Sequence, residues 1–296
     1  MADYKITCCS TADISAEHLK SLDVSYAKYH YILEGCDHPD DLFTTGTPQQ
    51  FYGLINAGAM PTTAQVTPEE LCALFEPILK QGLDLLHIEF SSGLSGGWQS
   101  AQAAKETMQK KYPDRKIYIV DSLAASSGYG LLVDKAAELK NKGLGIDELC
   151  LWLEANKLKL RHWFYATNLA HFKRGGRISG ASAAIGSMLK ICPVMDVNSQ
   201  GKLIIREKAL GRKKALKSVF SHMCGQAQDG MDYNQKCYIC HSVMDEDAAL
   251  LKGMIEETFP MLDGKVEINP IGTVIGSHTG PGTVAVFFFS NTDRGL

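Results

Sequence analysis

One serine of this sequence lies in a local pattern that is typical of catalytic nucleophiles. Ser95 is the central residue of Gly93-Leu94-Ser95-Gly96-Gly97, which satisfies the G-x-S-x-G pattern. The segment 84–90 before it reads as a strand, and the segment 98–111 after it reads as a helix. A strand, a sharp turn that carries the serine and a helix form the nucleophile elbow of α/β-hydrolases. The local pattern therefore allows Ser95 to be the nucleophile of a serine hydrolase or esterase.

The order of other polar residues along the chain also fits a hydrolase. Asp121 ends a predicted strand and His278 lies near the end of the sequence, so the order is Ser95, Asp121, His278. This is the order of a triad in α/β-hydrolases. The sequence before Ser95 contains no HGGG-like segment that would supply an oxyanion hole. The hydrolase hypothesis therefore depends on the loop and the chain order alone.

The same loop also suits the binding of an anion. A Gly/Ser loop that opens a helix presents free backbone N–H groups and the positive end of the helix dipole. Ser95 would then donate a hydrogen bond to a group such as a carboxylate. A third interpretation is a purely structural loop, because glycine and serine are common after parallel strands. The pattern leaves these three interpretations open.

Two further segments offer polar side chains. Thr62 and Thr63 lie in Pro61-Thr62-Thr63-Ala64-Gln65, a polar stretch between two predicted helices, where they cap a turn or contact a ligand. His278 begins His-Thr-Gly-Pro-Gly, which reads as a turn before the apolar strand 283–289. The glycines of this turn permit a close backbone approach to a bound molecule.

Strands alternate with helices along the first half of the chain. Segments 84–90 and 116–121 read as strands, and each is followed by a Gly/Ser-containing loop and a helix. This alternation predicts a parallel sheet with helices on both faces. Ligands of such sheets bind at the carboxyl ends of the strands, where the loops 91–97 and 122–127 lie. The predicted fold class is therefore α/β.

The remaining segments predict a second α/β unit. Residues 24–33 are expected to form one strand, and the acidic segment 34–47 a surface loop. We expect an N-terminal domain of residues 1–164, which carries the Gly/Ser loops, and a C-terminal domain of residues 165–296. Further expected elements are helices at 48–57, 181–189, from Arg212 onward and at 245–259, a hairpin at 198–201, and strands at 236–241 and 265–269.

The composition is that of a packed globular protein. The 296 residues are 45% hydrophobic and 21% charged, and the formal net charge of −3 gives no indication of nucleic-acid binding. The apolar runs are strand-sized and fall short of the ~20 residues of a membrane helix, so we expect no stable membrane insertion. The N-terminal Met-Ala-Asp-Tyr-Lys lacks the features of a signal peptide. We therefore expect a cytoplasmic protein.

The nine cysteines are expected to be reduced and mostly buried thiols. Cys237-Tyr-Ile-Cys240-His241 matches the haem c attachment sequence, and a Cys pair is also compatible with zinc. The surrounding Lys-Cys-Tyr-Ile-Cys-His-Ser-Val equally reads as a β-strand, and no second CxxC lies at zinc-finger spacing. We expect neither a metal nor a cofactor.

Six segments of the sequence resemble the DegV family in the same order, over essentially the whole chain. Each segment is short, but the combination is far more specific than any one of them. The segments are Ser10-Thr11-Ala12-Asp13, Thr62-Thr63-Ala64-Gln65, residues 91–101, Val120-Asp121-Ser122, residues 174–179 and His278-Thr279-Gly280-Pro281-Gly282.

This resemblance implies a two-domain fold, with a parallel sheet flanked by helices, a second α/β domain and a ligand site between them. Members of the family bind fatty acids, and bacterial carriers present the carboxylate to a fatty-acid kinase that forms an acyl phosphate. Matched residue by residue, the carboxylate ligands fall on Thr63, Ser95 and His278. A protonated His278 would also supply a compensating charge. The resemblance thus favours a non-enzymatic carrier of a long-chain fatty acid over the hydrolase.

The family residues that contact the kinase are matched less well in this sequence than the residues that bind the carboxylate. Alanine and valine flank Gln65 where the family usually has serine and proline, and Cys192 stands where lysine often precedes Pro193. Leu210 stands where the carriers have a basic residue. Candidates for partner docking are Arg174, Arg177, Arg206 and Arg212; the alternative is that the first two brace the glycine turn and the last two are solvated.

Overall fold

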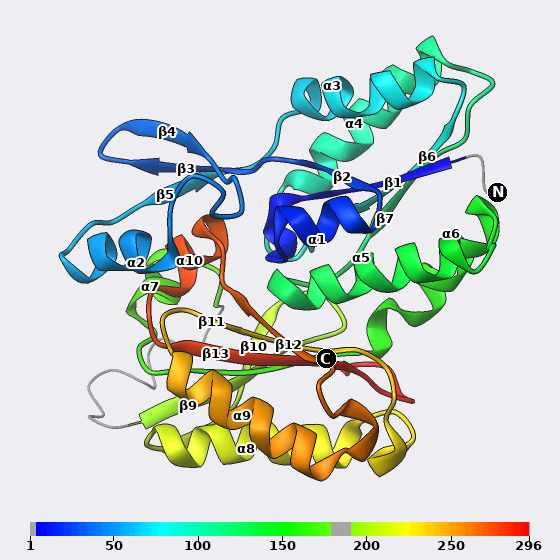
Figure 1. Cartoon of the computed structure of the whole chain (residues 1–296). Coiled ribbons are helices and arrows are strands. Elements are labelled where there is room, and N and C mark those ends of the chain that lie inside the picture. Colours follow the sequence, from blue (N-terminus) through cyan, green and yellow to red (C-terminus); the bar gives the residue numbers. More distant parts are fainter. Residues whose placement is uncertain (1–3, 179–190, 296) are drawn as a thin grey trace.

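The computed structural model describes residues 4–178 and 191–295, in which the chain forms three β-sheets (Figure 1). The first sheet has four parallel strands in the order β2-β1-β6-β7. Its central strands are largely buried, as expected where helices cover both faces of a parallel sheet. The strands are β1 (Tyr4–Cys9), β2 (Val24–Ala27), β6 (Asp84–Glu89) and β7 (Ile117–Asp121).

The second sheet has six strands in the order β10-β9-β8-β13-β11-β12. Its strands pair antiparallel, except that β11 and β12 are parallel. The central strand β13 is buried along its whole length. The strands are β8 (Leu160–Ala166), β9 (Ile191–Val197), β10 (Leu203–Leu210), β11 (Cys237–His241), β12 (Val266–Pro270) and β13 (Thr283–Phe289).

The third sheet is small and antiparallel, with the order β4-β3-β5. It lies beside the first sheet, together with α2 and α10 (Figure 1). Its strands are short and partly exposed. They are β3 (His30–Leu33), β4 (Cys36–Pro39) and β5 (Thr62–Ala64).

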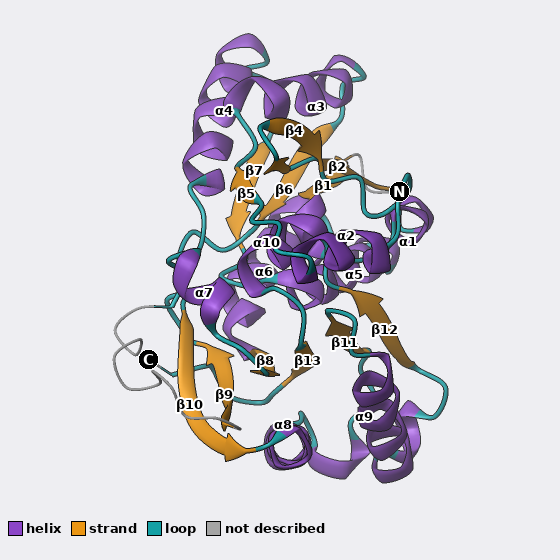
Figure 2. Cartoon of the chain, turned by 90° about the vertical axis from the view of Figure 1, so that its left-hand side faces the viewer, coloured by secondary structure: helices purple, strands orange, loops and turns teal. Residues whose placement is uncertain are grey.

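Helices separate and cover the two large sheets. Helix α5 contacts strands of both sheets and lies between them, whereas α3 and α4 cover the opposite face of the first sheet. Helices α8 and α9 cover the outer face of the second sheet (Figure 2). The helices are α1 (Ala16–Ser21), α2 (Pro48–Asn56), α3 (Pro68–Lys80), α4 (Gly97–Lys111), α5 (Ser126–Asn141), α6 (Ile146–Asn156), α7 (Ala170–Arg174), α8 (Arg212–Gln226), α9 (Asp245–Thr258) and α10 (Thr273–Thr279).

Two helices that precede and follow β5 begin with the same local device. The side chain of Thr67 accepts a hydrogen bond from the backbone of Glu70, and Glu70 in turn accepts from the backbone of Thr67. Thr47 and Gln50 form the equivalent capping box of α2. A proline follows each cap, where its missing N–H costs no helical hydrogen bond. Local sequence thus fixes the residues at which α2 and α3 begin.

The predicted α/β fold with a parallel sheet is confirmed, as are the strand–loop–helix units around Ser95 and Asp121. The helix from Arg212 and the strand at 236–241 are also present, as α8 and β11. The predicted helix at 181–189 lies outside the described residues. None of the helices within residues 4–178 and 191–295 is long and apolar enough to cross a membrane.

Two predictions for residues 24–47 are wrong. Residues 24–33 form two strands, because the chain leaves the first sheet at Tyr29, whose backbone N–H donates to Ser10 Oγ and whose carbonyl accepts from the N–H of Asp40. The expected surface loop at 34–47 contains β4, which pairs with β3. Its polar residues are compatible with a strand because β4 lies at the edge of the small sheet.

Two other predictions change. The polar stretch around Thr63 is strand β5 of the small sheet. His278 lies in the last turn of α10, which ends at Thr279 and is followed by Gly280 with a φ of 66°. The division into domains 1–164 and 165–296 stays a prediction. Strand β8 begins at Leu160 and belongs to the second sheet, which favours a boundary a few residues earlier.

Arg294 joins the C-terminal segment to both large sheets. Its side chain is 3% exposed. It donates to the carbonyl of Leu123, in the loop after β7, over 2.9 Å, and to the carbonyl of Val197, at the end of β9, over 3.4 Å. Its backbone N–H donates to the carbonyl of Leu158 over 2.8 Å. One buried side chain therefore satisfies carbonyl groups from segments far apart in the sequence.

We predict that Arg294→Met lowers the free energy of unfolding by about 2–3 kcal/mol, because buried carbonyl groups lose their donors while the length of the side chain is kept. Urea unfolding followed by circular dichroism measures this change. Lys110→Met, at an exposed position of α4, is the matched control and should be nearly neutral. Equal unfolding midpoints for the two variants would contradict the assigned role of Arg294.

Candidate functional site

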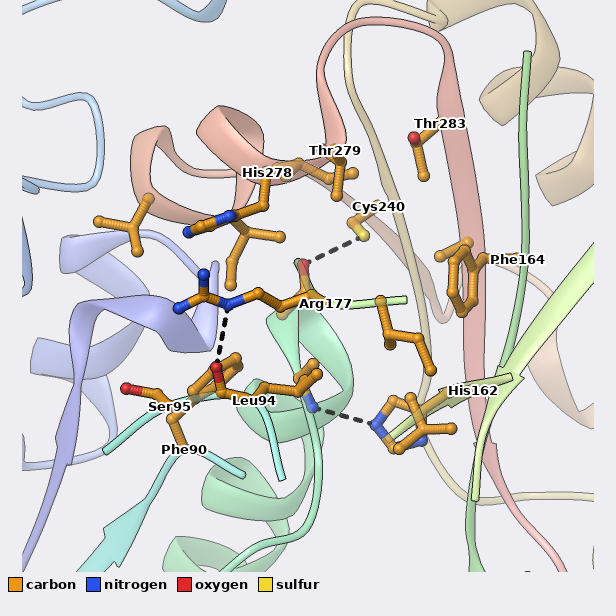
Figure 3. Close-up of a pocket in the computed structure, with 18 of the residues that line it drawn as sticks. Phe90, Leu94, Ser95, His162, Phe164, Arg177, Cys240, His278, Thr279 and Thr283 are labelled. Atoms are coloured by element: carbon orange, nitrogen blue, oxygen red, sulfur yellow. Dashed lines mark hydrogen bonds between the residues drawn. The ribbon is translucent and has the colours of Figure 1, made fainter. Parts of the chain in front are cut away.

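A cavity of about 180 Å³ lies between the two large sheets. The loops after β6 and β7 form one wall, strands of the second sheet form another, and α10 closes a third side (Figure 3). The parallel strands β6 and β7 place both loops at the same edge of their sheet. The lining residues include Phe90, Leu94, Ser95, Ala125, Ser126, His162, Phe164, Phe172, Arg177, Val197, Leu203, Cys240, Ile271, Val274, Ile275, His278, Thr279, Thr283, Ala285 and Phe287, with Tyr29, Thr63 and Gln65.

Most of the cavity wall is apolar. On the second sheet, Phe164 lies opposite Ala285 and His162 lies opposite Phe287. Residues directly opposite each other in an antiparallel pair point to the same face, so these side chains line the cavity together. Val274 of α10 completes this part of the wall. The cavity can therefore bury an apolar group.

Several polar side chains, among them the predicted carboxylate ligands, gather at one end of the cavity. Thr63 Oγ1 of β5 and His278 Nε2 of α10 are hydrogen-bonded at 2.7 Å. Ser95 and the guanidinium of Arg177 lie on the same side as His278 in Figure 3, and Phe164 and His162 lie on the other. The structure thus brings together the three residues that the sequence predicted to bind a carboxylate.

The Ser95 loop is held by hydrogen bonds and by close packing. The backbone N–H of Ser95 donates to the carbonyl of Ser91 over 3.1 Å, and the N–H of Gly97 donates to Ser95 Oγ over 3.2 Å. Ser95 Oγ also lies 3.3 Å from the hydroxyl oxygen of Tyr29. A Cβ on Gly97 would lie 1.9 Å from that hydroxyl oxygen. The loop therefore requires glycine at this position.

His278 is neutral at physiological pH. Burial, together with the positive charges of Arg177 and Arg174, lowers the pKa of its imidazole from 6.5 to about 4. Protonation, the condition under which His278 would supply a compensating charge, is therefore disfavoured by its surroundings. The neutral ring uses Nε2 for Thr63, and Nδ1 is buried without a hydrogen-bond partner.

Arg177 lies in the cavity wall, although its sequence position suggested only a docking or turn-bracing residue. Its Nε donates to the carbonyl of Leu94 over 3.2 Å, and its guanidinium also donates to the carbonyl of Gly175. These partners are uncharged, so the positive charge stays available to an anion beside Ser95. Sequence reasoning missed this placement because the glycine turn gave no direction for the side chain.

The other basic candidates lie outside the cavity lining. Arg174 is exposed and donates to the carbonyl of Ser277 over 3.3 Å. Arg206 forms an ion pair with Asp196 at 3.0 Å. The guanidinium of Arg212 makes two hydrogen bonds to the carboxylate of Asp247, at 2.8 and 3.1 Å. Arg206 and Arg212 thus each pair with a carboxylate and remain exposed to solvent, so the docking and solvated alternatives both stay open.

The residues of the hypothetical hydrolase triad belong to separate hydrogen-bond groups. Asp121 Oδ1 accepts from the backbone N–H groups of Ser92 and Leu123, at 3.2 and 3.0 Å. His278 Nε2 bonds Thr63, and Ser95 Oγ contacts Tyr29 and Gly97. A triad requires the histidine to bridge the serine and the carboxylate. The geometry therefore gives the hydrolase no support.

The Cys-Tyr-Ile-Cys-His segment is strand β11, as the strand interpretation predicted. Cys237 packs against Met223 at 4.0 Å, whereas Cys240 lies 3.3 Å from the hydroxyl of Ser126 in the cavity wall. Residues three apart on a strand point to opposite faces. The two thiols therefore have different neighbours and do not converge on one site.

Comparison with known protein families agrees with this geometry. The profile described as "Uncharacterised protein, DegV family" matches residues 3–291. A DegV domain-containing protein of Clostridium perfringens is 43% identical over 292 residues, which cover 99% of each chain. A DegV domain-containing protein of Lactococcus lactis is 30% identical over 300 residues, covering 98% of this chain and 99% of the relative.

Solved structures of the same family share the fold. A DegV family protein from Thermus thermophilus, described by its fatty-acid binding, has a TM-score of 0.85 at 28% identity and covers 97% of this chain and 99% of its own. DegV from Bacillus subtilis, described as a fatty-acid-binding protein, has a TM-score of 0.82 at 26% identity, with coverage of 98% and 100%.

The depressed pKa of His278 predicts a pH-dependent stability. As the pH falls from 6.5 to about 4, the unfolded chain protonates this residue and the folded protein does not, so the free energy of unfolding decreases. At ~1.4 kcal/mol per pKa unit, the loss from His278 is at most about 3 kcal/mol. His278→Gln removes it, so urea unfolding of this variant should depend less on pH than that of the wild type.

His38→Gln is the matched control, because His38 stacks on Tyr31 and does not line the cavity. Identical pH profiles for the wild type and His278→Gln would show that the imidazole titrates normally in the folded protein.

Proposed function

This chain belongs to the DegV family, and we propose that it binds one long-chain fatty acid in the cavity between its two large sheets. The observation that carries the proposal is the distribution of polarity along the cavity. An apolar wall leads to one end where two hydroxyl groups, a histidine and an arginine gather. Family relatives described as fatty-acid-binding proteins support the choice of ligand.

The carboxylate receives hydrogen bonds from Thr63 and Ser95. We assign the proton of the neutral imidazole to Nε2, because Nδ1 is buried without a partner for an N–H group. Nε2 then donates to Thr63 Oγ1, and the threonine proton is free to point into the cavity. The N–H of Gly97 donates to Ser95 Oγ in the same way. The oxygen atoms of Thr63 and Ser95 thus each accept a hydrogen bond from the protein, and each hydroxyl can donate its proton to the ligand. His278 acts through Thr63 in this arrangement.

Arg177 supplies the opposite charge. A buried carboxylate without a positive partner costs several kcal/mol, and the neutral His278 does not provide one. The bound carboxylate in turn favours the protonated imidazole, so the pKa of His278 rises when the site is filled. The ligand-free and filled sites therefore differ in the tendency of His278 to bind a proton.

The acyl chain supplies most of the gross binding energy. Burial of each CH₂ group contributes ~0.8 kcal/mol, so a chain of ~16 carbons gains far more from the apolar wall than from its head group. The phenylalanine side chains of the wall, among them Phe90, Phe164 and Phe287, provide this surface. The head-group contacts then determine the orientation of the ligand.

We further propose that the bound fatty acid is presented to a fatty-acid kinase, which transfers phosphate to the carboxylate. The chain itself carries out no reaction in this proposal. It keeps the acyl chain out of water and holds the carboxylate at the polar end of the cavity. Arg174, Arg206 and Arg212 are candidate contacts for the kinase. A carrier needs to bind the carboxylate but not to react with it, so its anion site needs no nucleophile.

Native mass spectrometry of the purified protein tests the fatty-acid proposal. We expect one copurified fatty acid per wild-type chain. Ser95→Ala should weaken binding of a fluorescent fatty acid about tenfold, because a charge-assisted hydrogen bond is lost, and should carry less copurified ligand. Ser92→Ala, three residues earlier in the same loop, is the control. A wild-type protein that neither carries nor binds fatty acids would contradict the proposal.

The carrier role predicts that Arg206→Gln and Arg212→Gln, combined, slow acyl-phosphate formation by a cognate kinase several-fold at low salt. Glutamine removes the positive charges without placing new negative charges against Asp196 and Asp247. The difference from the wild type should shrink at high salt, because surface charges mainly steer association. Fatty-acid affinity should be unchanged, as for Lys110→Gln. Equal rates at low salt would exclude these residues from the partner surface.

A further inference from the structure

A chain of buried polar groups extends from Ser95 into the first sheet. The hydroxyl oxygen of Tyr29 lies 3.3 Å from Ser95 Oγ, and the hydroxyl donates to Glu89 Oε1 over 2.9 Å. Glu89 Oε2 lies 2.9 Å from Nε2 of His87, and Nδ1 of the same ring lies 2.9 Å from Thr7 Oγ1. The side chains of Thr7, His87 and Glu89 are 0% exposed. Hydrogen bonds and polar contacts therefore connect Ser95 to fully buried side chains of the first sheet.

Donors surround the carboxylate of Glu89. The hydroxyl of Tyr29 and the backbone N–H of Phe90 reach Oε1, at 2.9 and 3.0 Å. The thiol of Cys9 and the imidazole of His87 reach Oε2, at 3.4 and 2.9 Å. An ionised carboxylate only accepts, and it has about four sites for hydrogen bonds. All four contacts are satisfied when Glu89 is ionised and the proton of Tyr29 points to it.

The hydroxyl oxygen of Tyr29 consequently faces Ser95 as an acceptor. Burial, followed by the charge of Glu89, raises the pKa of Tyr29 well above 10, so the phenol keeps its proton. Ser95 Oγ already accepts the N–H of Gly97. The remaining role of the Ser95 hydroxyl is to donate, and the Tyr29 oxygen is the acceptor beside it.

We propose that Tyr29 is a positioning residue that holds the Ser95 proton in the ligand-free site, and that a bound carboxylate takes this hydrogen bond over. This inference rests on the proposed fatty-acid site. The distance of 3.3 Å is long for a bond between hydroxyl groups, so a negatively charged oxygen displaces Tyr29 readily. An uncharged ester or alcohol oxygen exchanges one neutral hydrogen bond for another. Every ligand of Ser95 gives up the same hydrogen bond to Tyr29, so the phenol lowers the affinity of the site for its ligand.

The test is Tyr29→Phe, which removes the competing acceptor and keeps the ring. The variant should bind a fluorescent fatty acid about threefold more tightly, because no hydrogen bond is given up when the ligand engages Ser95. The gain should vanish in Ser95→Ala/Tyr29→Phe compared with Ser95→Ala. Tyr26→Phe, on strand β2, is the matched control and should leave affinity unchanged. Urea unfolding of each variant verifies that it is folded.

The outcomes separate this inference from the proposed function. Weaker or unchanged binding by folded Tyr29→Phe, or a gain that persists without Ser95, would overturn the role of Tyr29. If the single variant Ser95→Ala kept full affinity, the ligand carboxylate would not bind to this loop, and the proposed site would be wrong independently of Tyr29. A tighter Tyr29→Phe variant whose gain depends on Ser95 supports the competition between the phenol and the ligand.

Elemental analysis provides an independent check of the proton assignment. Within residues 4–178 and 191–295, donor atoms of Cys9, His87 and Glu89 form a group that could hold a metal ion, with all of them within 4.8 Å of one another. We expect no stoichiometric zinc in the purified protein. One tightly held zinc ion per chain, lost in Glu89→Gln, would overturn the inference, because Glu89 would then bind the ion in place of the Tyr29 proton.

Discussion

The hydrogen bond between His278 and Thr63 links two elements that are 215 residues apart in the sequence. Thr63 belongs to the small sheet beside the first large sheet, and His278 belongs to the helix that precedes the central strand of the second sheet. This contact closes the polar end of the cavity. The depressed pKa of His278 follows from the same placement, because the ring is buried beside Arg177 and Arg174. The position of the small sheet therefore determines both the shape and the charge of the site.

Local sequence was sufficient to predict the elements that carry the Ser95 loop. Strand β6 is a short segment that contains Leu85, Leu86 and Ile88, α4 follows a Gly/Ser segment, and parallel strands bring their following loops to one edge. The small sheet was not predictable in the same way. Its strands contain three or four residues each and are partly exposed, so they lack the apolar alternation that identifies longer strands. Their pairing depends on tertiary contacts such as those of Tyr29 with Ser10 and Asp40.

The candidate site shows the same division between local and long-range information. Ser95, Thr63 and His278 were identified from short motifs, and the structure brings them together. The placement of Arg177 in the cavity and the contact of Tyr29 with Ser95 were not predicted. Both depend on side-chain directions that spacing along the chain does not specify. The positive charge for the proposed carboxylate ligand is therefore assigned to Arg177 and not to His278, whose pKa is lowered.

A serine in a G-x-S-x-G loop between a strand and a helix can be a nucleophile or a hydrogen-bond donor. The side chain that contacts its hydroxyl group distinguishes the two roles. A nucleophilic serine needs a base that accepts its proton near neutral pH. Behind Ser95 lies a phenol whose pKa is raised well above 10 and which already donates to Glu89. Such a phenol accepts a hydrogen bond but cannot remove the proton. The Ser95 hydroxyl consequently remains a donor, which is the property that a carboxylate-binding site requires.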